Sequence, residues 1–194
     1  MMNNKKTLVV ASGNKGKIKE IADILKDFNI VGYKDLGFNE EIEETGTTFY
    51  ENALIKAKTV SLTLNLPALS DDSGLCVEAL NGAPGVYSAR YAGDGKDESN
   101  IKKLLEKMKD YKDRRAKFVC CAVLFYPDGK SVSAIGECEG EILYQKNGNC
   151  GFGYDPIFYS YDLKKSFGEA TEEEKNSVSH RARAIHILKD KIKL

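Results

Sequence analysis

The segment 117–126 constrains the fold more than any other part of the chain, because it suits a strand that is covered on both faces. Its sequence, KFVCCAVLFY, is apolar almost throughout and contains Val, Phe and Tyr. Strands with one buried face alternate apolar and polar residues, whereas strands between two layers of helices read as continuous apolar runs. The chain is therefore expected to contain a sheet with helices on both sides.

The remaining segments predict an α/β protein with a mixed sheet. Strand-like runs and segments with helical periodicity alternate along the chain, and a Pro-Asp-Gly turn at 127–129 joins two of the strands into a hairpin. Strands are expected at 7–12, 30–33, 68–70, 117–126 and 131–142, and helices at about 16–28, at 49–64, at 101–108 and from a capping box at Thr171 onward. We find no repeat or linker, so residues 1–194 are expected to form one domain, with room for two lobes.

Composition excludes several classes of function. The chain has 29 basic and 29 acidic residues, so it has no net charge with which to attract a long nucleic acid. It has no apolar run of about 18 residues, so no membrane span is expected. The apolar segment 7–11 is too short for a signal peptide, which favours a cytoplasmic location. The five cysteines show no C-x-x-C spacing, so mostly buried thiols are expected rather than a zinc site.

A loop of small and basic residues lies between the first predicted strand and the first predicted helix. Small residues let a backbone approach an anion closely, and the N-terminus of the following helix offers free N–H groups. The spacing is not that of a P-loop, and an ordinary tight turn with solvated lysines is the alternative. The residues proposed to hold an anion are Ser12, Gly13, Asn14, Lys15, Gly16 and Lys17.

Two acidic segments indicate a site for a hard metal ion. Residues 40–44 contain four glutamates and would alone be read as a solvated loop. Residues 70–74, SDDSG, follow a short apolar run, so Asp71 and Asp72 are expected at the C-terminal end of a strand, where α/β sheets place ligands. Adjacent carboxylates repel unless a cation compensates, and carboxylate oxygens select Mg²⁺ or Mn²⁺. Aspartates that cap a loop are the alternative.

Two later segments suggest contacts to a flat ring and to phosphate. In residues 148–156, GNCGFGYDP, glycines interleave with two aromatic residues, which suits stacking on a purine, although a simple loop is the alternative. On the last predicted helix, Lys175 and Ser179 are four residues apart and are expected to share a face. The following His180 and Arg181 add hydrogen-bond donors.

Taken together, six ordered blocks resemble the Ham1/inosine-triphosphate pyrophosphatase family of house-cleaning nucleotide hydrolases. The resemblance runs from Leu8 to about Leu188 and shows no departure at the chemical positions. It implies an elongated two-lobed fold around a long mixed sheet, with the active site in a cleft between the lobes and a homodimer as the usual assembly. The blocks are Ser12–Lys17, Glu43–Gly46 with Phe49–Ala53, Ser70–Leu75, Gly82–Tyr91, Gly151–Phe158, and Glu174–Lys175 with Ser179–Arg181.

The resemblance also implies a reaction and a role for each block. A small-molecule substrate such as ITP, dITP or XTP would be hydrolysed to the monophosphate and pyrophosphate, with Mg²⁺ as cofactor and Mn²⁺ as a substitute. Glu43 and Asp72 would hold the metal, and Asp72 would also accept the proton from water. The substrate contacts would come from Ser12, Gly13, Asn14, Lys15, Gly16, Lys17, Ser73 and Lys175 around the phosphates, and from Phe152, Gly153, Tyr154, Asp155, His180 and Arg181 around the base.

Some questions stay open at this level. Asp71 could share the proton-accepting role, Lys56 is a second-rank candidate for the site, and Arg90 could contact a second subunit or the substrate. A nucleotide-binding regulatory domain without turnover is one alternative function. Another is a house-cleaning hydrolase that acts on modified pyrimidine or canonical deoxynucleotides.

Overall fold

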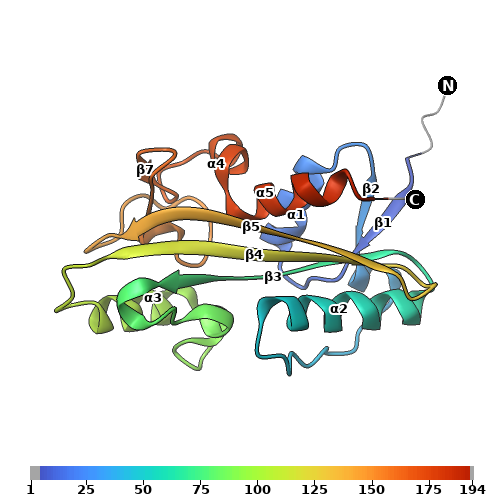
Figure 1. The fold of residues 1–194 in the computed structure, drawn as a ribbon, viewed down its shortest axis with the longest axis horizontal. Helices are drawn as coiled ribbons and strands as arrows, with labels where there is room; N and C mark the ends of the chain where they lie inside the picture. The colour runs from blue at the N-terminus through green and yellow to red at the C-terminus, as the bar shows by residue number, and fades with distance from the viewer. Residues whose placement is uncertain (1–4, 193–194) are drawn as a thin grey trace. The chain divides into compact units, whose positions relative to one another are not determined.

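The computed structural model describes residues 5–192, and these form an α/β protein on one seven-stranded sheet (Figure 1). In chain order the strands are β1 (Thr7–Val10), β2 (Asn29–Gly32), β3 (Ala68–Val77), β4 (Arg115–Phe125), β5 (Ser131–Ile142), β6 (Phe158–Ser160) and β7 (Lys165–Ser166), and they lie side by side in the order β2-β1-β3-β4-β5-β6-β7. β1 runs parallel to β2 and β3, whereas β6 runs antiparallel to β5 and β7. The predicted mixed sheet is confirmed.

The helices begin and end largely where local signals predict. They are α1 (Lys15–Ile24), α2 (Phe49–Leu64), α3 (Asp97–Lys107), α4 (Glu172–Val178) and α5 (His180–Lys189). α2 begins at a capping box in which Thr48 and Glu51 satisfy each other's backbone N–H groups. It ends at Asn65, which adopts the left-handed conformation at φ 51°. Both ends match the prediction because both depend only on residues close in sequence.

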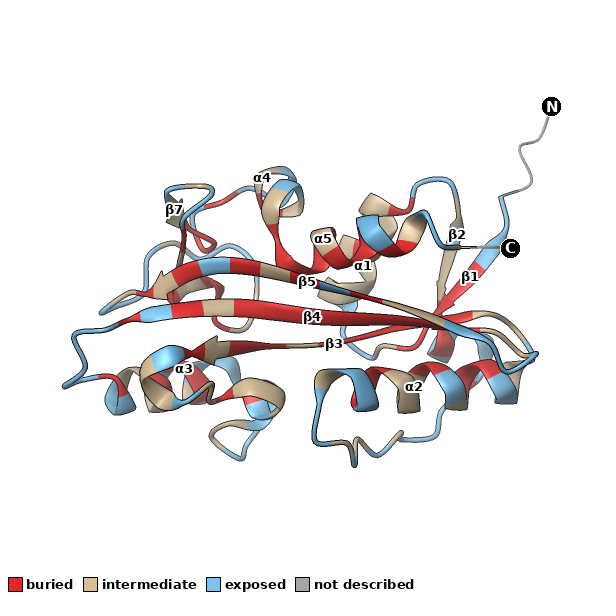
Figure 2. Cartoon of the chain, viewed as in Figure 1, coloured by how far each residue is buried: buried red, intermediate tan, exposed pale blue. Residues whose placement is uncertain are grey.

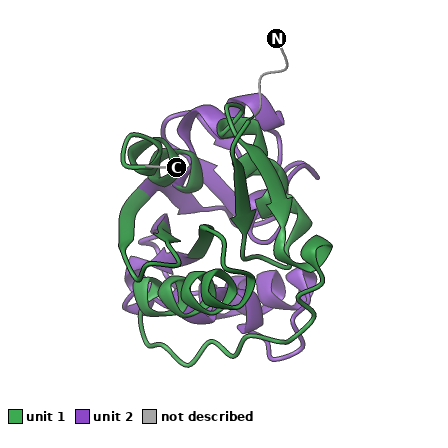
Figure 3. Cartoon of the chain, turned by 90° about the vertical axis from the view of Figure 1, so that its right-hand side faces the viewer, with its two compact units in different colours: residues 1–72, 120–136, 181–194 green, residues 73–119, 137–180 purple. Residues whose placement is uncertain are grey.

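The described residues fall into two compact units, each with its own core (Figure 3). Unit 1 comprises residues 1–72, 120–136 and 181–194, and unit 2 comprises residues 73–119 and 137–180. β3, β4 and β5 each contribute residues to both units. Residues 1–4 and 193–194 lie outside the described part.

The core of unit 1 shows why β4 is apolar on both faces. Cys120, Ala122 and Leu124 pack with apolar residues of α1 and α5, while the alternate residues of β4 pack with α2. Side chains alternate between the faces of a strand, so a strand between two helical layers needs an apolar residue at every position. Figure 2 shows β4 buried along most of its length, which confirms the two-sided prediction for this strand.

The core of unit 2 is built around aromatic rings. Phe118 lies 4.6 Å from Phe158 and 6.1 Å from Phe167, measured between ring centroids. Ile101 and Leu104 of α3 join the same cluster. These contacts position the long segment between β5 and β6, which carries the glycine-rich block of the sequence.

Three predicted elements were wrong in their extent. The helix expected at about 16–28 ends at Ile24. The strand expected at 68–70 continues to Val77 as β3, so Asp71 and Asp72 lie within the strand and not at its end. Gly74 and Leu75 are buried and the strand runs through them, so the aspartates do not cap a loop.

The single helix expected after Thr171 is broken at Ser179. This residue has extended backbone angles (φ −64°, ψ 154°), ends α4 and precedes α5. Lys175 and Ser179 therefore do not share one continuous helical face as predicted. The capping box of Thr171 and Glu174 is confirmed.

Cysteine burial and helix length bear on two further expectations. Cys120, Cys121 and Cys138 are buried thiols as expected, whereas Cys150 is exposed. None of the helices among residues 5–192 is long and apolar enough to cross a bilayer.

Candidate active site

The 12–17 loop connects β1 to the first turn of α1, as predicted. Asn14 caps the helix by accepting a hydrogen bond from the backbone N–H of Lys17, at 3.2 Å. The Ser12 hydroxyl accepts from the N–H of Asn14, also at 3.2 Å. These two side chains thus hold the loop closed. Gly13 has ordinary space around it, since an added Cβ would come no closer than 3.7 Å to Lys34, so the fold itself does not require a glycine there.

Asp71 joins the loop to α5 through a buried cluster of ion pairs. Its Oδ2 lies 3.1 Å from Lys17 Nζ and accepts hydrogen bonds from Nε and Nη2 of Arg181, at 3.2 and 3.1 Å. The same guanidinium contacts Glu20 of α1. Burial by itself raises the pKa of Asp71, but the charges of Arg181 and Lys17 outweigh it and hold that pKa well below its usual range. Asp71 is therefore a poor proton acceptor and an anchor for Lys17.

Asp72, the next residue of β3, has the opposite environment. Its contacts are weaker: Asn52 Nδ2 lies 3.3 Å from Oδ2 and Lys56 Nζ lies 3.5 Å from Oδ1. Burial raises the pKa of Asp72, a shift that Lys56 and Lys17 oppose and Glu44 reinforces, and the net effect is a raised pKa. Two neighbouring carboxyl groups whose pKa values are pushed apart are typical of a site that separates structural from proton-transfer roles.

The acidic loop approaches Asp72 through Glu44. Glu44 Oε1 lies 2.6 Å from Lys56 Nζ, so one lysine contacts both Glu44 and Asp72. The loop is tied to α2 because the Gly46 N–H donates to Asn52 Oδ1 at 2.8 Å. A Cβ at Gly46 would meet Glu51 Cβ at 2.6 Å, so this close approach requires glycine. Glu43, the predicted metal ligand, is exposed.

Sequence reasoning gave too little weight to two of these side chains. Lys56 was held as second rank, yet it is largely buried and forms both ion pairs. Asn52, which contacts both Gly46 and Asp72, lies in the Phe49–Ala53 block but was given no role. The available signal was their spacing: residues 52 and 56 are four apart in α2 and so lie on one side of the helix.

The unit 1 cluster offers carboxylate oxygens, the ligand type that Mg²⁺ prefers. Among the described residues, three cationic side chains form ion pairs with four carboxylates. Residues 5–192 hold no group of three His, Cys, Asp or Glu side chains arranged around a metal position. Mg²⁺ does not need one, since it keeps several waters and is completed by substrate phosphates. The cluster consists of Lys17, Lys56, Arg181, Glu20, Glu44, Asp71 and Asp72.

The glycine-rich segment of unit 2 is folded around a buried ion pair. Asp155 Oδ2 lies 2.6 Å from Lys175 Nζ and also accepts from the N–H of Phe152 at 2.9 Å. The lysine ammonium lies 4.5 Å from the centre of the Phe152 ring. A Cβ at Gly151 would meet Asp155 Oδ2 at 2.0 Å, so glycine is needed where the segment wraps around the carboxylate. Three predicted substrate residues, Phe152, Asp155 and Lys175, are thus in contact in this unit.

The residues after Ser179 are more buried than the sequence suggested. The ring of His180 is stacked on Phe118 with centroids 4.7 Å apart, and only 4% of the residue is exposed. Arg181 is 1% exposed and its guanidinium donates to Asp71 and Glu20. Both side chains therefore help to hold the fold, and the base contacts expected of them stay predictions. Ser73 is half-buried and is assigned to unit 2.

Comparisons with known proteins identify the family of this chain. A sequence profile described as Ham1 family matches residues 8–191. The chain belongs to the Ham1 family. A protein named dITP/XTP pyrophosphatase from Haemophilus influenzae is 50% identical over 97% of this chain and 100% of its own length. One of the same name from Bacillus cereus is 47% identical over 98% of this chain and 97% of its own length.

Solved structures of this family share the fold. The Staphylococcus aureus Ham1 protein superposes with a TM-score of 0.86 at 46% identity, covering 95% of this chain and 97% of its own. A HAM1 protein from Coxiella burnetii gives 0.87 at 41% identity, covering 95% and 97%. The α/β fold is thereby confirmed, while the cleft between lobes that the resemblance implies stays a prediction.

Proposed function

We propose that this Ham1 family protein hydrolyses non-canonical purine nucleoside triphosphates, such as ITP, dITP and XTP, to the monophosphate and pyrophosphate. The observation that carries the proposal is the contrast between Asp71 and Asp72 on β3. One carboxylate is neutralised by Arg181 and Lys17, while its neighbour is buried, weakly paired and has a raised pKa. The names of the closely similar relatives support the substrate class.

The side chains of the two units suggest which residues bind the phosphates, accept the proton and bind the base. Lys17, on the first turn of α1, is held by Asp71 and would direct its remaining donors to the phosphates. Burial raises the pKa of Asp72, which makes this carboxylate more basic, and Asp72 would take the proton from the attacking water. Asn52 and Lys56 hold the carboxylate of Asp72 in place. In unit 2, Phe152 and Asp155 would bind the base, while Lys175, which contacts both of them, would supply a cation for the phosphates.

The same residues fit a Mg²⁺ ion. Glu43 and Asp72 are proposed as ligands, with Glu44 close to Asp72 through their shared contact with Lys56. Bound Mg²⁺ would lower the pKa of water and screen the charge that develops on the phosphates. A homodimer and a cytoplasmic location also stay predictions.

The products test the proposed reaction. Hydrolysis of ITP in ¹⁸O-water should place the label in the monophosphate, because attack is proposed at the α-phosphorus with pyrophosphate leaving. Mass spectrometry of both products gives the answer. Label in pyrophosphate, or formation of the diphosphate and phosphate, would contradict the proposed attack site. Binding of ITP without any turnover in Mg²⁺ would favour a regulatory nucleotide-binding domain instead.

The choice of metal ligand has its own test. Glu43→Gln is expected to raise the Mg²⁺ concentration for half-maximal activity about tenfold, because one charged ligand is lost. Glu44→Gln is the matched control, since Glu44 contacts Lys56, and it should shift the Mg²⁺ requirement less. Titration of activity with Mg²⁺ measures both. A shift in Glu44→Gln alone would make Glu44 the ligand.

A further inference from the structure

The tip of the glycine-rich segment is held by a residue from a distant part of unit 2. The backbone N–H of Gly153 donates to Oδ2 of Asp97, at 2.7 Å, across 56 positions of sequence. Asp97 is the first residue of α3. Neither the sequence analysis nor the proposed reaction gives it a role.

The tip has a particular need for such an anchor. Gly151 and Gly153 both have positive φ, at 77° and 60°, and glycines there leave the backbone many alternative conformations. The base of the segment is well fixed, because Cys150 N–H donates to the Gly168 carbonyl at 2.8 Å and Asp155 is paired with Lys175. Gly153 lies between these two attachments, and nothing lies within 4 Å of the position its Cβ would take.

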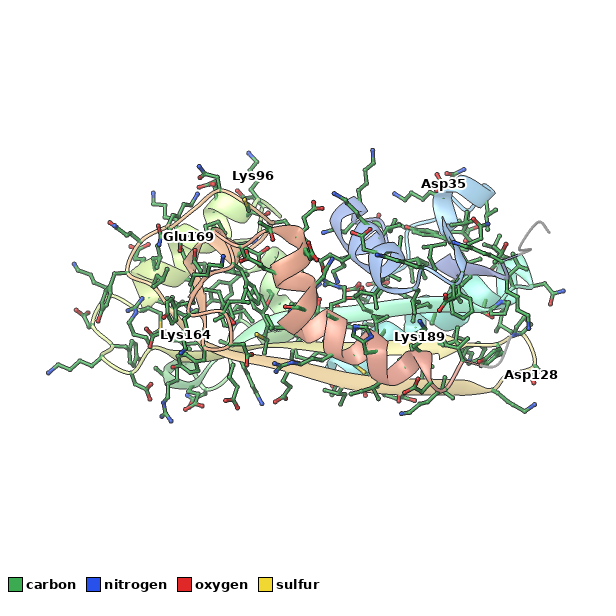
Figure 4. The ribbon with its side chains drawn as sticks, turned by 90° about the horizontal axis from the view of Figure 1, so that it is seen from above. Asp35, Lys96, Asp128, Lys164, Glu169 and Lys189 are labelled. Atoms are coloured by element: carbon green, nitrogen blue, oxygen red, sulfur yellow. The ribbon has the colours of Figure 1, made fainter. Side chains whose placement is uncertain are left out.

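The first turn of α3 is itself firmly placed. Asn100 accepts from the Ala92 N–H at 2.7 Å and donates to the Ala89 carbonyl at 3.1 Å. Glu98, next to Asp97, forms an ion pair with Lys146, two residues before the glycine-rich segment. Figure 4 labels Lys96, the residue that precedes α3, and it lies at the surface with an exposed side chain. The first two residues of α3, Asp97 and Glu98, therefore contact Gly153 and Lys146 respectively.

We propose that Asp97 is a positioning residue that holds the Gly151–Gly153 tip in the conformation that binds the nucleobase. This inference rests on the proposed function, in which Phe152 stacks on the base. The carboxylate acts through the Gly153 amide and does not itself touch the substrate. Its loss leaves the tip free to move, so ordering the tip then opposes binding of the base.

Hydrogen exchange tests the anchor without any substrate. In Asp97→Ala the Gly153 amide should exchange faster by about tenfold, while Asp97→Asn, whose side-chain oxygen can still accept, should retain most of the protection. Asp94→Ala is the matched control. Asp94 is an exposed aspartate just before α3, and its carboxylate accepts hydrogen bonds from the Lys96 N–H and the Ser99 hydroxyl instead. Equal exchange in all variants would overturn the proposal.

Inhibition constants test the consequence for the base. IMP should bind Asp97→Ala about tenfold more weakly, whereas inorganic tripolyphosphate, which lacks a base, should inhibit it as it inhibits the wild type. Asp97→Asn should bind IMP nearly normally. An equal loss for both inhibitors would show a general structural defect and overturn the positioning role. Absence of ITP turnover in the wild type would instead defeat the proposed function, which the exchange measurement does not depend on.

Discussion

Asp72→Asn is expected to lower kcat for ITP by about 10²- to 10⁴-fold while the protein remains folded. The substitution keeps the size of the side chain but removes its charge and its basicity. Asp72 is only weakly paired in the structure, so few native contacts depend on the charge. Initial rates of pyrophosphate release at saturating Mg²⁺ measure the effect. A variant that retains more than half of the wild-type kcat would remove Asp72 from the chemistry.

Asp71→Asn gives the contrast to this variant. Asp71 is fully buried and pairs with Lys17 and Arg181, so its loss removes a carboxylate partner from both cations. Breaking such a pair typically costs about 3–5 kcal/mol of stability. Thermal unfolding should therefore separate the two positions: a large fall in Tm for Asp71→Asn and a small one for Asp72→Asn.

ITP and XTP are expected to exceed ATP in kcat/KM by about 10²- to 10⁴-fold. Hypoxanthine and xanthine present a 6-carbonyl acceptor and an N1–H donor, whereas adenine presents a 6-amino donor and an N1 acceptor. A backbone amide cannot reverse its polarity, so a pocket of fixed donors around 152–155 would leave groups unpaired against adenine. Each such mismatch costs about 1–3 kcal/mol. Parity between ITP and ATP would defeat this argument.

Some of the donors near the proposed base site already form hydrogen bonds within the protein and are less suited to bind the 6-carbonyl of the base. The amides of Phe152 and Gly153 already donate to Asp155 and Asp97, and Arg181 donates to Asp71. GTP shares the 6-carbonyl, so its expected exclusion depends on its 2-amino group meeting a closed or donor-lined wall. A comparison of kcat/KM for ITP, XTP, GTP and ATP tests the expected rejection of adenine and of guanine. Good turnover of GTP would contradict only the rejection of guanine.

Several features were predictable because they depend on residues near one another in sequence. The apolar run of β4 predicted a strand with both faces covered, and alternate residues do pack against helices on opposite sides. The ends of α2 follow from a capping box at Thr48 and a left-handed Asn65. The 12–17 loop leads into a helix N-terminus as expected, since Asn14 is a favourable cap.

The candidate site was predictable in its residue types but not in its division of roles. Motifs identified Lys17, Asp71 and Asp72 as neighbours in a polar site. They could not show that Arg181, 110 positions away, would neutralise one aspartate and leave the other with a raised pKa. That difference arises from burial and long-range charge, neither of which has a local sequence signal.

By itself, then, the sequence determined the class of fold, the family and the segments that carry the chemistry, because strand periodicity, helix caps and ordered motifs are local. The tertiary structure decided where elements stop and what each polar group faces. β3 continues through Ser73 and Gly74 because both sides of the strand are covered. Only the packed chain brings Asp97 to Gly153, since contacts between distant segments depend on how the layers meet.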